Sequence, residues 1–98
     1  MNSALLNKNI IARIDKAGVF HGRLDYIDEQ IIRLKDVRRI YQWNGALSVT
    51  DMAVNGITGG KVTIPVSTVE FISNNIIELN ECSDEATEAI IAITPWKN

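Results

Sequence analysis

Alternation of apolar and polar residues, broken by very short connections, is the feature that most constrains the fold of this chain. It begins at Asn9, where Ile10, Ala12 and Ile14 fall on one side of an extended segment, as expected of a β-strand with side chains on alternate faces. Connections of two or three residues allow consecutive strands to pair only antiparallel, as a meander. Four strands are predicted, over residues 9–15, 19–27, 31–34 and 37–43, with a bend or a close backbone approach at Gly22.

The second half of the chain predicts shorter elements. A helix is expected over Ser48–Val54, capped by Ser48 or Thr50. A second helix opens at Ser83, has acids in its first turn and runs to about Ile93. Pro65 lacks the N–H that a central strand needs, so it is placed at an edge or a break. Three strands are predicted here, over residues 61–64, 69–72 and 76–79.

Together these elements predict one small mainly β domain. The 98 residues, 46% of them apolar, support one modest core and are assigned to a single domain, 1–98. The expected architecture is an SH3-like or Sm-like bent antiparallel sheet, or a partly open barrel, with two short helices. Folds of this size serve many functions, so the fold by itself predicts no activity.

Charge is distributed unevenly along the chain. The net charge is −2, but residues 1–49 carry +3 and residues 50–98 carry −5. The acidic balance argues against binding to long nucleic acid, while the basic half still allows a local anion site. The sequence has no long apolar run and no cleavage signature, which predicts a cytoplasmic protein without membrane contact. A single cysteine, Cys82, fits a reducing compartment.

The segment from Arg38 to Ser48 contains the strongest candidate for a binding site. Its paired guanidinium groups suit anions, and its rings suit flat aromatic ligands. In a regular strand Arg39, Tyr41 and Trp43 share one face, which is therefore the preferred ligand face, whereas Arg38 lies on the other. The candidate ligand-binding residues are Arg39, Tyr41, Trp43, Arg38, Asn44, Ser48 and His21.

A purely structural interpretation of the same segment stays open. Rings on a strand of a small barrel often belong to the core or to an interface, and the arginines could pair with acidic residues. His21 is then a partly buried structural residue. Trp96 is interpreted as an anchor that packs the chain end on its own core or on a neighbouring subunit.

Several short motifs are spread over nearly the whole chain: Ala17-Gly18-Val19 with Gly22 and Leu24, residues 37–46 with Ser48, Ile64-Pro65-Val66, Glu81-Cys82-Ser83 and Trp96. Together they resemble a family of small bacteriophage-encoded proteins of unknown function. The chain departs from that family's pattern at Phe20–His21, where the order of histidine and aromatic is reversed, and at Gln42, where the family has an aromatic residue. The reversal places His21 on the opposite face of the strand from the histidine of the family, since neighbouring strand residues face opposite ways.

The resemblance implies a phage or prophage origin and the cytoplasm of a host cell as the location. By analogy with other small phage proteins, it suggests a homo-oligomeric sponge that sequesters a nucleotide-derived signal of bacterial immunity. The sequence has no catalytic constellation, metal cluster or cofactor motif, so neither an enzyme nor a cofactor is predicted. Two alternatives remain, an Sm-like module that binds single-stranded RNA and a protein inhibitor of a host factor.

Overall fold

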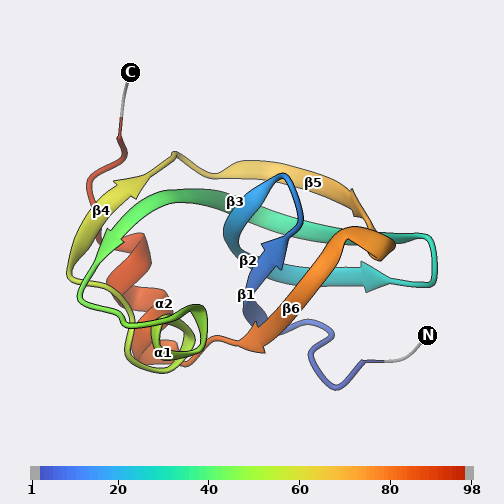
Figure 1. Cartoon of the computed structure of the whole chain (residues 1–98), viewed down its shortest axis with the longest axis horizontal. Helices are drawn as coiled ribbons and strands as arrows, with labels where there is room; N and C mark the ends of the chain where they lie inside the picture. The colour runs from blue at the N-terminus through green and yellow to red at the C-terminus, as the bar shows by residue number, and fades with distance from the viewer. Residues whose placement is uncertain (1–2, 97–98) are drawn as a thin grey trace.

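A bent, open antiparallel sheet with two helices at one end forms the fold, as the computed structural model of residues 3–96 shows (Figure 1). The strand order is β4-β3-β2-β1-β6, and β5 pairs with the part of β3 that β4 leaves uncovered. The predicted fold class, a small mainly β domain with a bent antiparallel sheet, is confirmed. The elements are β1 (Asn9–Ile14), β2 (Gly18–Ile27), β3 (Ile31–Asn44), α1 (Val49–Asn55), β4 (Gly59–Val62), β5 (Val66–Ile72), the 3₁₀ turn η1 (Ser73–Asn75), β6 (Ile76–Glu81) and α2 (Asp84–Ile91).

Two hydrophobic clusters fill the two sides of the sheet. One lies between the sheet and the helices and includes Ile11, Ile40 and Met52. The other lies inside the bend of the sheet and includes Ile10 and Phe20. Because β1 alternates its side chains between these clusters, both of its faces are buried from Ile10 to Ala12.

The sheet bends where the pairing of β2 with β3 shifts in register, and the sequence indicated only part of this bend. Residues 31–34 and 37–43 were predicted as two strands, and this is wrong: they form the single strand β3. Asp36 has a positive φ of 52° and lies where the pairing of β2 with β3 shifts, so it kinks the strand without ending it. The expectation of a close approach at Gly22 is confirmed, because a Cβ there would lie 3.1 Å from the carbonyl oxygen of Lys35.

Both predicted helices form, with the predicted serine caps. The Ser48 hydroxyl accepts a hydrogen bond from the backbone N–H of Asp51, and the Ser83 hydroxyl accepts one from Ala86. The second helix ends at Ile91, with Ala92 as its C-cap, two residues before its predicted end.

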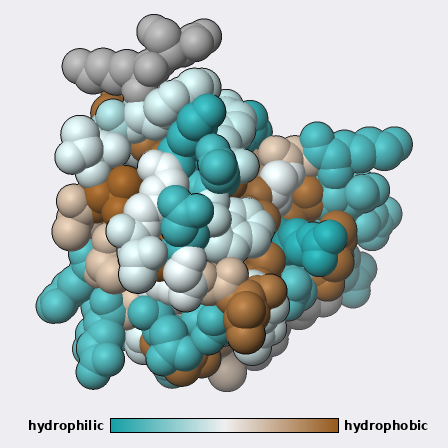
Figure 2. Space-filling view, turned by 60° about the vertical axis from the view of Figure 1, so that its left-hand side comes forward, coloured by the Kyte–Doolittle hydropathy of each residue, from teal (hydrophilic) through white to brown (hydrophobic). Residues whose placement is uncertain are grey.

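The surface over the helices and β4 is mixed in polarity. Figure 2 shows hydrophobic side chains on this face separated by polar ones, which is typical of solvent-exposed surface. Across residues 3–96 the helices are all too short or too polar to cross a membrane.

Candidate ligand-binding site

A groove opens where β3 changes partners. Residues 63–65, which include Pro65, connect β4 to β5 and leave a gap in the pairing along β3. Thr63 closes part of this gap, because its hydroxyl accepts a hydrogen bond from the backbone N–H of Arg39 and its N–H donates to the Arg39 carbonyl, both at 3.0 Å. The remaining hollow has a volume of about 280 Å³ and is lined by Phe20, Val37, Arg39, Tyr41, Thr63, Ile64, Val66 and Val69.

Arg39 is the one charged residue in this lining. Its guanidinium carbon lies 4.8 Å from the centre of the Phe20 ring and 5.4 Å from that of Tyr41, both within the range of cation–π attraction. One guanidinium nitrogen donates to the Tyr41 hydroxyl at 3.3 Å, and the buried Nε has no hydrogen-bond partner. No carboxylate among residues 3–96 pairs with Arg39. The groove therefore holds an uncompensated cation between two rings, which is suited to an anionic group.

Tyr41 extends this arrangement to the C-terminal segment. Its side chain is 53% exposed, and its ring meets the Trp96 ring edge to face, with the centroids 5.5 Å apart. Trp96 is fixed by its backbone N–H, which donates to the Val62 carbonyl at 2.8 Å. Trp96 thus holds the chain end within one chain, but it packs on the exposed Tyr41 ring and not on the core as predicted. This contact stands beside the candidate site.

Trp43 does not share the face of Arg39 and Tyr41, so the prediction of one common face is wrong. The pairing of β3 with β4 shifts between Ile40 and Gln42, where β3 has one residue more than β4. This extra residue reverses which face of the sheet the following side chains of β3 point to. Trp43 therefore packs against the helix-side cluster that contains Ile40. It lines a separate pocket of about 470 Å³ with Arg13, Leu47, Ser48 and others.

Ser48 and Asn44 have structural roles of their own. The Ser48 hydroxyl caps α1, and the Asn44 carbonyl accepts hydrogen bonds from the backbone and hydroxyl of Thr58. Neither residue lines the groove that contains Arg39.

His21 and Arg38 lie on the helix side of the sheet. His21 is only 2% exposed, and its Nε2 lies 3.4 Å from the Thr87 hydroxyl of α2. Burial, with a smaller effect from the nearby Arg38 charge, lowers the pKa of His21 from 6.5 to about 4. His21 is therefore a neutral core residue at pH 7, and a surface ligand does not reach it. The structural interpretation of this histidine is correct, although it is more deeply buried than expected.

Cys82 is also buried on the helix side, and burial raises the pKa of its thiol, so it is a poor nucleophile. In the described part of the chain, no three metal-ligating side chains come together.

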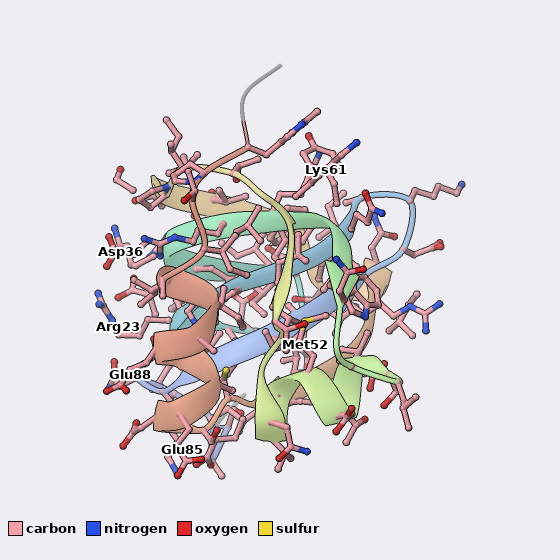
Figure 3. The ribbon with its side chains drawn as sticks, turned by 90° about the vertical axis from the view of Figure 1, so that its left-hand side faces the viewer. Arg23, Asp36, Met52, Lys61, Glu85 and Glu88 are labelled. Atoms are coloured by element: carbon pink, nitrogen blue, oxygen red, sulfur yellow. The ribbon has the colours of Figure 1, made fainter. Side chains whose placement is uncertain are left out.

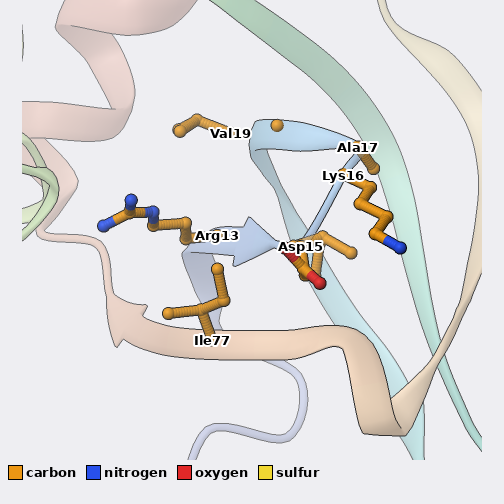
Figure 4. Close-up of a pocket in the computed structure, with 8 residues that line it drawn as sticks. Arg13, Asp15, Lys16, Ala17, Val19 and Ile77 are labelled. Atoms are coloured by element: carbon orange, nitrogen blue, oxygen red, sulfur yellow. The ribbon is translucent and has the colours of Figure 1, made fainter.

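A second hollow, of about 390 Å³, surrounds the turn between β1 and β2. Figure 4 shows the side chains of Arg13 and Lys16 pointing away from one another there. Because the two cations do not converge, this hollow is a weaker candidate than the Arg39 groove.

Six residues that line the Arg39 groove were not candidates from the sequence: Phe20, Val37, Thr63, Ile64, Val66 and Val69. Trp96, which stands beside the groove against Tyr41, was not a candidate either. For Phe20 the sequence offered one signal, because this ring stands two residues before Gly22, where a bend of the strand was expected. Thr63 and Trp96 carry none, because their positions depend on how β4 and the C-terminal segment pack.

Comparison with known proteins identifies the family but not an activity. The model of a domain of unknown function (DUF6948) matches residues 7–90, so the chain belongs to this family. The search of curated proteins gives no match. The search of solved structures likewise gives none.

Proposed function

We propose that this member of the family is a non-enzymatic binding protein whose Arg39 groove takes a small ligand of nucleotide type. The observation that carries the proposal is the Arg39 guanidinium, held between the Phe20 and Tyr41 rings without a carboxylate partner in the described structure. A nucleotide combines an anionic group with a flat base, and these are the two chemistries that the groove offers.

The dimensions of the groove favour a site completed by a second copy of the chain. A volume of about 280 Å³ lies just below the range for ligand pockets, about 300–1,000 Å³. A second subunit placed over the open side would bury the ligand more fully and cover the exposed side chains of Ile64 and Val66. We therefore propose a homo-oligomer, at least a dimer.

The biological role that we propose is sequestration. A protein that binds a nucleotide signal of bacterial immunity without converting it would act as an anti-defence sponge in the cytoplasm of a phage-infected cell. This role is supported by the resemblance of the sequence to small bacteriophage proteins. The anion-and-ring chemistry of the groove supports the ligand class.

Thermal unfolding in the presence of nucleotides tests the proposal. A ligand at about one hundred times its Kd stabilises the fold by about 2.7 kcal/mol, which in a domain of this size raises the Tm by roughly 10–20 °C. AMP, ADP-ribose and cyclic dinucleotides are the probes. Arg39→Gln is expected to abolish the rise, and Arg38→Gln to preserve it, because the neighbouring arginine lies on the opposite face.

Two results would contradict the proposal. The first is that no nucleotide raises the Tm of the wild-type protein. The second is that Arg38→Gln removes the rise while Arg39→Gln keeps it. The shared pocket is tested separately, by size-exclusion chromatography with light scattering at saturating ligand. A protein that is monomeric at micromolar concentration under these conditions would contradict the shared pocket.

A further inference from the structure

The site has a second cation, placed on the far side of the aromatic pair from Arg39. Lys61 belongs to β4, and its ammonium nitrogen lies 5.3 Å from the centre of the Trp96 ring. Figure 3 shows Lys61 projecting beside the C-terminal segment. Lys61 was not a candidate from the sequence, because it stands alone among uncharged residues.

The four side chains form a row. The guanidinium of Arg39 lies 5.4 Å from the Tyr41 ring, the Tyr41 and Trp96 rings are 5.5 Å apart, and the Lys61 ammonium is 5.3 Å from Trp96. The row thus has a cation at each end and two rings between them. We call it the Arg39–Lys61 row.

The electrostatic surroundings favour anions at both ends. Within residues 3–96 neither Arg39 nor Lys61 forms a salt bridge. The acidic side chains of α2 do not reach the row, since Figure 3 shows Glu85 and Glu88 at the opposite end of that view from Lys61. Lys61 is exposed, so its charge is available to a ligand in solution.

From this row we infer that the ligand carries two phosphate groups flanking a base, that is, a dinucleotide unit. The inference rests on the proposed function and names the ligand class of the same site. A mononucleotide uses the Arg39 end and one ring and leaves Lys61 unused. A dinucleotide places its second phosphate at Lys61 and gains a contact with the Trp96 ring, which base stacking makes favourable.

A dinucleotide unit can come from a free signalling molecule or from single-stranded RNA, and the experiment separates these sources. Binding of AMP, a cyclic di-AMP probe and an eight-residue oligoadenylate is measured by titration calorimetry at two salt concentrations. Variants Lys61→Gln and Arg39→Gln are compared with the control Lys16→Gln, which removes the same charge from the β1–β2 turn.

The wild-type protein is expected to bind the cyclic dinucleotide at least tenfold more tightly than AMP. Lys61→Gln should reduce the dinucleotide affinity to nearly that of AMP and leave AMP binding unchanged, whereas Arg39→Gln should weaken both. Lys16→Gln should change neither. Far-UV circular dichroism of each variant establishes that the fold is retained.

Other outcomes overturn the inference in distinguishable ways. If AMP and the dinucleotide bind equally, or Lys61→Gln weakens both to the same degree, the proposed function stands but the second phosphate site is wrong. If the oligoadenylate binds most tightly and with a steep dependence on salt, the free dinucleotide is the wrong source. If no probe binds the wild-type protein, the proposed function itself is wrong.

Discussion

Buried His21 predicts a specific loss of stability in mild acid. The unfolded chain binds a proton at this histidine with a pKa of 6.5, whereas burial and the charge of Arg38 lower the pKa in the folded protein to about 4. Between these values the unfolded state binds more protons, so the free energy of unfolding falls as the pH falls from 6.5 to 4. At 1.36 kcal/mol per pKa unit the loss is about 3 kcal/mol, a large share of the 5–15 kcal/mol typical of small domains.

The effect is measured by urea unfolding of the wild-type protein and of His21→Leu at a series of pH values between 7 and 4. Acidic residues titrate in both proteins, so the difference between the two curves isolates the imidazole. This difference should change by about 3 kcal/mol in favour of His21→Leu as the pH falls. Thr87→Val is the control, since it removes the neighbouring hydroxyl and keeps the pH dependence. A difference curve that stays flat from pH 6.5 to 4 would refute the burial argument.

Two further predictions concern the backbone and a helix cap. Gly60→Ala should lower the free energy of unfolding, measured by chemical denaturation, much more than Gly18→Ala. Both glycines have a positive φ. Only at Gly60 does an added Cβ meet the main chain, where it comes closest to the carbonyl oxygen of Gln42. Equal losses would show that φ alone determines the cost. Ser48→Ala should cost about 1 kcal/mol by loss of the α1 cap. The control Ser67→Ala, at an exposed position of β5, should cost almost nothing, and a Ser48→Ala variant as stable as this control would contradict the capping role.

The elements that depend on local chemistry were predictable from the sequence. Alternation located β1 and β2, the serine hydroxyls located both helix starts, and Pro65 located the break between β4 and β5. The continuity of β3 was not predictable. Lys35–Asp36 has the composition of a turn, and only pairing with β2 on one side and β5 on the other keeps the strand extended through the positive φ of Asp36.

The sequence by itself determined which residue types could form an anion-and-ring site, because Arg39 and Tyr41 stand two apart in a strand and so lie on one face. The tertiary structure decided which of their neighbours join them. The shift in pairing near Tyr41 turns Trp43 toward the helices. The C-terminal segment brings Trp96 to the other side of the Tyr41 ring, and β4 brings Lys61 to Trp96. Strand alternation is a local property that a single extra residue reverses, whereas contact between Tyr41 and Trp96 depends on the path of the whole chain between them.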